Sequence, residues 1–426
     1  MAGQQWILFY GVLSFQKLNM IRERLRLKNN RLFKGHVDRC LADNGRMRRS
    51  VFTSYDKIML KINAVIMLQK RGESAMRNLT IGMDLGDKNH VITILDEDGV
   101  IVRSCSLDND QTSIIKFFKK YQGSIVAIEA GTHSPWISRE LKALGCNVLV
   151  GNPRKLRSIW NSDDKADVHD SEMLARIARF DSGLLYPITH RSEQAQVDLE
   201  LLKARDMLVK TRTNLINHVR GAVKSFGERL PKCSAASFHK QCLDFLPENL
   251  RTVLQAILET IEHVTGRIKD FDRGIEKISR EVYPETELLK AIGGVGPLTA
   301  LAYVLILEDP GRFGKGRQVG KFLGLTPRRD QSGETDKQLR ITKAGNRFLR
   351  RLLVGAAQYI LGPFGPDCNL RRFGLRLMER GGKNAKKRAV VAVARKLAVL
   401  MHHLWRNGEV YDPFCKSHRV EMQNAA

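Results

Sequence analysis

Residues 79–86 read LTIGMDLG, an apolar run that carries a single acid, Asp84, and then turns at Gly86. A second apolar run at 124–131, SIVAIEAG, carries Glu129 at the same point near its end. Both runs have the length of a strand and end at glycine. An unpaired carboxylate within an apolar strand is costly, so its repeated placement predicts that both acids have a function.

A third segment adds two more acids. Residues 165–180, KADVHDSEMLARIARF, read as a helix in which Asp167 and Asp170 are three positions apart. That spacing places both carboxylates on one helix face. Two strands and one helix that each present acids are typical of a nuclease of the ribonuclease H type, which holds divalent metal for phosphoryl transfer.

Each of these acids alone is more often a solvated surface group or a helix cap. Asp87, Asp163 and Asp164 are rival ligands, which rank lower because they follow the turn or precede the helix. Three histidines could lie near the site, although isolated histidines more often satisfy local hydrogen bonds: His90, His133 and His169.

The segments around the acids predict a mixed α/β fold. Asp98-Gly99 joins two strands and is a strong hairpin signal. Hairpin strands followed by alternating helices and strands are the order of a ribonuclease H-like sheet, with the two acidic strands as central neighbours. The expected strands are 79–86, 90–98, 100–107, 124–131 and 147–153, and the expected helices are 113–121 and 134–145.

Charge is distributed unevenly along the 426 residues, whose net charge is +26. Residues 311–410 carry 23 Lys/Arg against 6 Asp/Glu, and residues 1–75 carry 15 against 5. Residues 76–310 are nearly neutral. A neutral acidic-site domain beside a strongly basic one predicts a polyanion, nucleic acid, that is held by one part and cut by the other.

Composition also bounds the location of the protein. Seven scattered cysteines without a C-x-x-C pair predict reduced thiols, with neither a disulfide framework nor a zinc site. No apolar stretch reaches the length of a membrane helix. We therefore expect a cytoplasmic protein with no membrane partner. The basic residues 1–75 read either as an over-extended reading frame with its natural start at Met76 or as a nucleic-acid arm.

Residues 190–285 are expected to be helical. Apolar residues recur at alternating spacings of four and three for more than four heptads, which predicts a coiled-coil element. The seam must pack within the chain or across a dimer, so a homo-oligomer, dimer or tetramer, is expected. The seam positions are Leu250, Leu254, Ile257, Ile261, Val264, Ile268, Phe271, Ile275, Ile278 and Val282.

The C-terminal region, residues 286–410, is expected to be mainly helical. Residues 288–309 have a helix-hairpin-helix pattern, in which Gly294 and Gly296 form a tight turn that could direct backbone N–H groups at a phosphate. A polar, charged loop and a basic helix follow. A second basic amphipathic helix is expected at 381–405, and residues 411–426 form a tail.

These residues together resemble a known family, the DEDD-type transposases of insertion sequences, which includes the Piv site-specific invertase. The resemblance runs from about residue 79 to 406. The last two of its motifs are specific in combination, whereas the acids alone would also fit Holliday-junction resolvases of the RuvC type. The motifs are IGMDLGDKNH, VAIEAGTHSPW, KADVHDSEMLAR, AIGGVGPLTA and LGLTPRRDQSGETDKQLRITKAGNRFLRRLLVGAA.

The resemblance implies a RuvC-like domain at 76–189, a coiled-coil linker and a C-terminal transposase domain with a nucleophilic serine. The family's acids fall on Asp84, Glu129, Asp167 and Asp170, and its serine falls on Ser332. It further implies Mg²⁺ or Mn²⁺, and a multimer that recombines DNA with a structured guide RNA. Relatives often have Ser-Ser-Gly-Gly here, whereas this chain has Gly333-Glu334-Thr335, which makes Thr335 a weak rival nucleophile.

A serine hydroxyl is a weak nucleophile that needs activation, which metal on the acids could supply. Basic residues around Ser332 could clamp the phosphate: Arg328, Arg329, Arg340, Lys343 and Arg347. Two other functions stay open from the sequence. A RuvC-type endonuclease would use water, with Ser332 as a loop residue, and a binding protein would hold nucleic acid without cutting it.

Overall fold

The computed structural model describes residues 79–156, 167–333 and 335–414, which form two compact units with their boundary between residues 188 and 189. The expected extension at 1–75, its Met76 start and residues 415–426 of the expected tail at 411–426 lie outside these residues. The five-part division of the chain therefore stays a prediction.

The first unit is built on a five-stranded sheet in the order β3-β2-β1-β4-β5. β1 pairs with β2, and β2 with β3, in antiparallel fashion, while β1–β4 and β4–β5 are parallel. The expected hairpin and the central pairing of the two acidic strands are both confirmed. The strands are β1 (Thr80–Asp84), β2 (Asn89–Leu95), β3 (Ile101–Asp108), β4 (Ile125–Glu129) and β5 (Asn147–Gly151).

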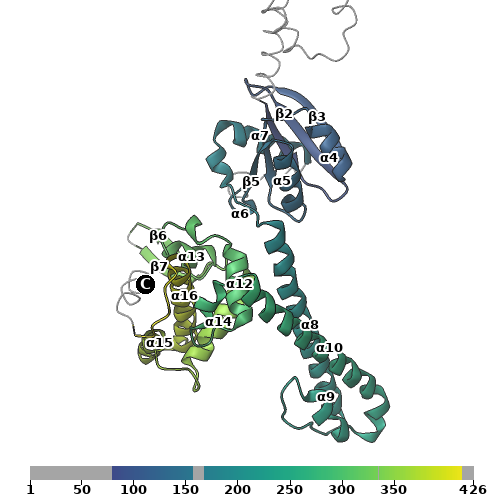
Figure 1. The fold of residues 1–426 in the computed structure, drawn as a ribbon, viewed down its shortest axis with the longest axis vertical. Helices are drawn as coiled ribbons and strands as arrows, with labels where there is room; N and C mark the ends of the chain where they lie inside the picture. Colours follow the sequence, from purple (N-terminus) through teal and green to yellow (C-terminus); the bar gives the residue numbers. More distant parts are fainter. Residues whose placement is uncertain (1–78, 157–166, 334, 415–426) are drawn as a thin grey trace, which may run out of the picture. The chain divides into compact units, whose positions relative to one another are not determined.

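Helices cover both faces of this sheet (Figure 1). On one face, α4 (Gln111–Phe118) and α5 (Ser134–Ala143) pack on the alternate residues of β1 that begin with Ile81. On the other face, α7 (Asp167–Phe180) packs over β1, β2 and β4. Because side chains alternate along a strand, Gly82 and Asp84 lie on the α7 face. The short α6 (Pro153–Leu156) follows β5.

Two long helices, α8 (Glu193–Ser225) and α10 (Glu248–Glu281), run side by side in the second unit (Figure 1). Nine of the ten expected seam positions on α10 are buried or half-buried, and only Val282 is exposed. The seam therefore packs within the chain. Near the loop that joins the helices it shares a cluster with α9 (Phe238–Gln241). Assembly through the seam stays a prediction.

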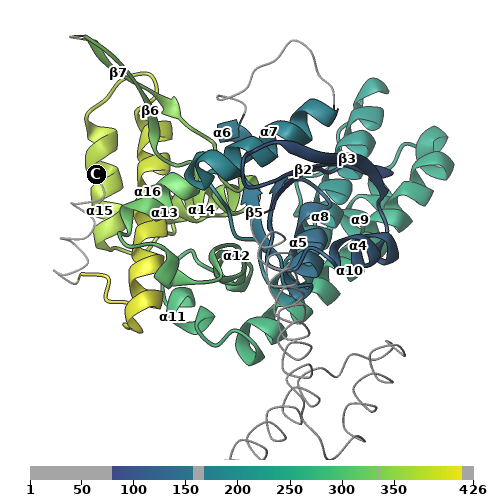
Figure 2. The ribbon, with the colours of Figure 1, turned by 90° about the horizontal axis from the view of Figure 1, so that it is seen from above.

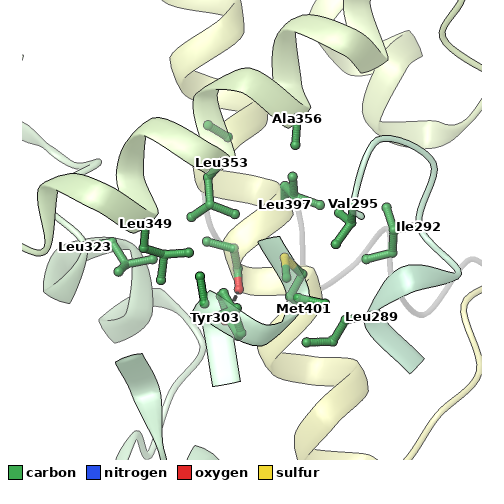
Figure 3. Close-up of a cluster of buried hydrophobic side chains, with 14 of the residues drawn as sticks. Leu289, Ile292, Val295, Tyr303, Leu323, Leu349, Leu353, Ala356, Leu397 and Met401 are labelled. Carbon is green, nitrogen blue, oxygen red and sulfur yellow. Dashed lines mark hydrogen bonds between the residues drawn. The ribbon is translucent and has the colours of Figure 1, made fainter. Parts of the chain in front are cut away.

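The C-terminal core surrounds α12 (Pro297–Leu307), which is apolar on all sides and buried from Thr299 to Leu307. A helix of this composition is stable only when neighbours enclose it. The Tyr303 hydroxyl donates a 2.6 Å hydrogen bond to the Ala398 carbonyl (Figure 3). The surrounding helices are α11 (Thr286–Lys290), α13 (Arg317–Phe322), α14 (Arg347–Leu361), α15 (Asn369–Glu379) and α16 (Ala385–Asn407).

The prediction of a charged loop before α14 is partly wrong, because most of this segment forms two strands. β6 (Pro327–Ser332) and β7 (Thr335–Ile341) form an antiparallel two-stranded ribbon. Its residues are mostly polar on both faces, so the alternation of apolar and polar residues that marks a half-buried strand is missing. Separately, no helix within the described ranges is long and apolar enough to cross a membrane.

Candidate functional site

Asp84 is the last residue of β1, the central strand, and it is half-buried. The pKa of its carboxyl group is raised by burial, and further by the charges of Asp170 and Asp167. A hydrogen bond from the Leu85 backbone partly offsets this rise. The structure therefore brings Asp84 within electrostatic reach of Asp167 and Asp170, although more than eighty positions separate it from them in the sequence.

Helix α7 reaches the sheet because β1 has a glycine beneath it. A methyl group on Gly82 would lie 1.9 Å from the carbonyl oxygen of Ser171 and 2.6 Å from the amide nitrogen of Ala175. The Ser171 hydroxyl also makes a buried 2.8 Å hydrogen bond with Thr93 of β2. These contacts fix the first turn of α7, and with it Asp170, directly over the strand that ends at Asp84.

Glu129 comes to the same edge of the sheet. It ends β4, which runs parallel to β1 with Met83 opposite Ile128, so Glu129 and Asp84 are the next residues of neighbouring strands. Ala127, two positions earlier, packs in a cluster with residues of α7. Glu129 therefore lies on the α7 face as well. All four predicted acids share one face and one end of the sheet.

The acids suit a hard divalent cation, because carboxylate oxygens are the ligands that Mg²⁺ prefers. Within the described ranges, no three His, Cys, Asp or Glu side chains already stand close enough to hold a metal ion. The rivals Asp163 and Asp164 lie outside those ranges. Burial and then repulsion by Asp170 and Asp167 raise the pKa of Asp84, and a bound cation would offset that repulsion.

The other rivals have partners or surroundings of their own. The side chain of Asp87 is 94% exposed and lies 3.3 Å from Nε2 of His133. His90 is buried on the opposite face of the sheet, beside Ile92, and burial lowers its pKa. His169 is exposed on α7. None of these side chains adds a ligand to the acids in this structure.

Ser332 ends β6 at the tip of the β6–β7 ribbon. The ribbon extends beyond the ends of the neighbouring helices (Figure 2), and Arg328 to Ser332 are exposed. Gly333 follows with a φ of +55°, a left-handed conformation that favours glycine at the turn. The serine is therefore accessible to a large substrate.

The register of the ribbon decides which charged residues share a face with Ser332. Asp330 lies opposite Lys337, and Gln331 lies opposite Asp336. Arg340 is exposed and lies beside the register shift in the ribbon. Since side chains alternate along the regularly paired residues, Lys337 shares the face of Ser332, whereas Arg329 lies on the opposite face. Arg329 there forms a 3.1 Å ion pair with Asp336. Of the other predicted basic residues, Arg328 lies beside a register shift in β6, while Lys343 and Arg347 are exposed beyond the ribbon.

Gly294 and Gly296 lie in the turn between α11 and α12. Gly294 has a φ of +90°, and a methyl group there would lie 2.9 Å from the Tyr359 ring, so packing and backbone geometry both require glycine. A methyl group on Gly296 would meet open space. The turn borders an open hollow of about 620 Å³ whose lining includes Lys290 and Arg351.

Sequence reasoning missed the residues that position the acids. A single glycine within an apolar strand often marks a close backbone approach, so Gly82 carried a readable signal. Thr93 and Ser171 carried none, because their contact spans 78 positions. Lys337 became visible only once the register of the ribbon was known.

Comparison with known proteins adds two family matches. A model described as "Transposase IS116/IS110/IS902 family" matches residues 286–367. A model of the IS110 DEDD type, described as "Transposase", matches residues 81–227. The first match includes the ribbon and the second includes all four acids.

Individual relatives agree with these matches. The chain is 26% identical over 364 residues to the "Transposase for insertion sequence element IS1111A" of Coxiella burnetii, which covers 84% of this chain and 97% of the relative. It is 27% identical over 341 residues to a "Probable family 20 transposase" of Pseudomonas aeruginosa. That match covers 78% of this chain and 98% of the relative. The "Pilin gene-inverting protein" of Moraxella lacunata is 28% identical over 158 residues. That match covers 36% of this chain and 48% of the relative.

Proposed function

Because the chain belongs to the IS116/IS110/IS902 family of transposases, we propose that it moves an insertion sequence with an acidic metal centre and a serine nucleophile. A transposase cleaves and rejoins DNA. The observation that carries the proposal is the gathering of four acids on one face and one end of the sheet. The strand order, hairpin first and parallel strands after, supports a ribonuclease H fold of the RuvC kind.

Mg²⁺, or Mn²⁺ in its place, would be held by Asp84, Glu129, Asp167 and Asp170. Such a cation neutralises charge that develops on a phosphate and lowers the pKa of an attacking oxygen. The acids contribute the negative charge that attracts it. Asp167 and Asp170 lie in the first turn of α7, the end of a helix where negatively charged side chains are favoured.

Ser332 would supply the covalent step. Its oxygen bonds to phosphorus of the DNA backbone, the phosphorus–oxygen bond to one sugar breaks, and the serine proton passes to the released sugar oxygen. Rejoining is the reverse, with a sugar hydroxyl attacking the phosphoserine and restoring the serine. No water is consumed, so the phosphodiester bond energy is conserved. The exposed ribbon supports this role, because a phosphate can reach its tip.

The partners that we propose are DNA, a structured guide RNA and further copies of the chain. RNA guidance and assembly rest on the resemblance in sequence motifs. The excess of 23 Lys/Arg over 6 Asp/Glu at 311–410 supports a polyanion in general. RNA bound to protein purified from cells that express the whole element would test the guide.

The serine can be tested on DNA that carries the element and its flanks. Ser332→Ala should eliminate recombination and the denaturant-resistant protein–DNA adduct, while DNA binding and folding survive. Thr335→Ala is the matched control and should keep both recombination and the protein–DNA adduct. Recombination by Ser332→Ala, or an adduct mapped to Thr335, would refute the assignment of the nucleophile. Cleavage without any adduct in the wild type would favour the water-using endonuclease.

The acids can be tested separately. Asp84→Ala, Glu129→Ala and Asp170→Ala should each abolish cleavage in Mg²⁺ and leave DNA binding largely intact. Asp87→Ala is the control, because its carboxylate is 94% exposed and pairs with His133 rather than with the four acids. Loss of binding by the three variants, rather than of cleavage, would instead indicate a protein that holds nucleic acid without cutting it.

A further inference from the structure

A strongly basic turn joins α15 to α16 and has no part in the proposed chemistry. Its five cationic residues all have exposed side chains, and residues 380–388 contain no acid. The turn also lies outside both segments matched by the family models. We call these five residues the basic turn: Arg380, Lys383, Lys386, Lys387 and Arg388.

The cations of the basic turn lack ion pairs within the part of the chain that the structure describes. No carboxylate of residues 79–156, 167–333 or 335–414 forms an ion pair with any of the five. Arg372, by contrast, is paired with Asp367 at 2.5 Å only eight positions before Arg380. Arg388 donates a 3.3 Å hydrogen bond to the Gly381 carbonyl, which leaves its charge in place. The result is a concentrated positive surface.

The position of these cations is unfavourable for the helix that carries them. Lys386, Lys387 and Arg388 lie in the first turns of α16, where the helix dipole is positive and acids are preferred. The first turn has no acidic residue, and Asn384 makes no capping hydrogen bond through its side chain. A sequence that breaks a local stability rule in this way is expected to serve a function.

The surface is held on a rigid support. Ala385 and Ala389 bury the inner side of the first turns of α16. A methyl group on Gly374 of α15 would lie 2.7 Å from the side chain of Val393, so the two helices pack closely. The turn itself uses Gly381 and Gly382, with φ values of +70° and +93°. The cations are therefore presented from a fixed backbone.

We propose that the basic turn is a docking surface for the sugar–phosphate backbone of double-stranded DNA. Lysine and arginine that neutralise phosphates supply most of the sequence-independent affinity for a duplex. Residues 380–388 contain no aromatic side chain on which an unpaired base could stack, which disfavours a single strand. The proposal rests on the proposed function only in taking DNA as the polyanion, and it requires neither Ser332 nor metal.

The test is the salt dependence of binding. Full-length protein with Lys383→Gln, Lys386→Gln and Lys387→Gln would be titrated onto a labelled DNA duplex of arbitrary sequence, in EDTA, over a series of KCl concentrations. The slope of log affinity against log salt should fall by about 3, roughly one for each phosphate that the variant no longer neutralises. Affinity at low salt should fall by at least about tenfold. The thermal midpoint without DNA should be unchanged or higher, because the N-terminus of α16 loses cations.

A matched variant removes the same charge elsewhere. It carries three substitutions of exposed lysines at the C-terminal ends of α4 and α5: Lys116→Gln, Lys119→Gln and Lys142→Gln. This control should change the slope by less than about 1. Equal slopes for the two variants would overturn the proposal, because the effect would then be one of net charge. The proposal would also be overturned if the basic-turn variant lost affinity only for an RNA duplex of the same sequence, because the surface would then bind RNA.

Failure of this proposal is distinguishable from failure of the proposed function. Binding in EDTA requires no cleavage, whereas the serine and metal assignments are measured by adduct formation and cleavage in Mg²⁺. The basic turn could therefore prove irrelevant to DNA while Ser332 still forms its adduct.

Discussion

At the scale of single residues, Gly82 determines how closely α7 approaches the sheet. A methyl group there would meet two backbone atoms of α7, at 1.9 Å and 2.6 Å, and neither can move without the helix. We expect Gly82→Ala to lower the free energy of unfolding by about 3 kcal/mol, as overpacking does in other cores. Urea denaturation followed by circular dichroism would measure the loss.

The same substitution should weaken Mg²⁺ binding, because a displaced α7 carries Asp170 away from Asp84. Gly131→Ala is the control, since a methyl group at Gly131 would have no neighbour within 4 Å. Wild-type stability in Gly82→Ala would mean that α7 does not rest on the backbone of β1.

Lys396 is a second residue whose environment has a measurable consequence. Its side chain is buried, with Nζ 4.0 Å from the centre of the Phe373 ring. Burial, with the nearby charges of Arg395 and Arg376, lowers its pKa from 10.5 to about 8. Between pH 8 and 10.5 the unfolded chain thus binds the proton more tightly than the folded one. The buried charge therefore lowers the free energy of unfolding in full below about pH 8. This destabilisation disappears as the pH rises towards 10.5.

Lys396→Met should therefore stabilise the protein at pH 7 and have no such effect near pH 10.5. A shift of this size corresponds to roughly 3 kcal/mol, from which removal of the cation–π interaction subtracts about 1 kcal/mol. We expect a net gain of about 2 kcal/mol at neutral pH. Denaturant titrations of both proteins across this pH range would show it. A difference that does not depend on pH would mean that the buried charge is not its cause.

At the scale of elements, the β6–β7 ribbon separates two kinds of basic residue. Lys337 shares the face of Ser332, whereas Arg329 lies on the other face in an exposed pair with Asp336. Lys337→Gln should slow single-turnover cleavage by roughly tenfold or more, the equivalent of about 1.5 kcal/mol for a contact to phosphate. Arg329→Gln should have a much smaller effect on the same rate. The reverse order would place the scissile phosphate on the opposite face.

Elements with a strong apolar period could be predicted from the sequence. α8 and α10 are of this kind, because burial of one stripe leaves a period of 3.6 in the sequence. β1 and β4 could be predicted as continuous apolar runs, because central strands are buried on both faces. The ribbon could not be predicted, because polar side chains on both of its faces erase that period. Its register, and so the separation of Arg329 from Ser332, depends on backbone pairing that composition does not encode.

At the scale of the whole molecule, the sequence predicted which acids to consider but not what brings them together. Asp84 and Glu129 could be paired by inference, because neighbouring parallel strands end at the same edge. The placement of Asp167 and Asp170 depends on the close approach of α7 at Gly82 and on the hydrogen bond between Thr93 and Ser171. Such contacts join distant segments and leave no local pattern.

The association of several chains is the remaining property of the whole molecule that can be tested. Ile261 and Ile268 on α10 are 0% and 3% exposed within a single chain, so charge there would disrupt the α8–α10 pair itself at a cost of roughly several kcal/mol. Ile257 and Phe271 belong to the same seam but are only half-buried. A second chain that packs on the seam would have to cover these two side chains.

We therefore expect Ile257→Asp with Phe271→Asp to yield a smaller species by light scattering, with the helical circular dichroism of the wild type. Val253→Asp is the control, because that side chain is already 65% exposed and lies off the seam. An unchanged multimer with both substitutions would show that the seam is only an intrachain core. The surface that joins the chains would then have to be sought elsewhere, since the α8–α10 pair would already satisfy its own apolar stripe.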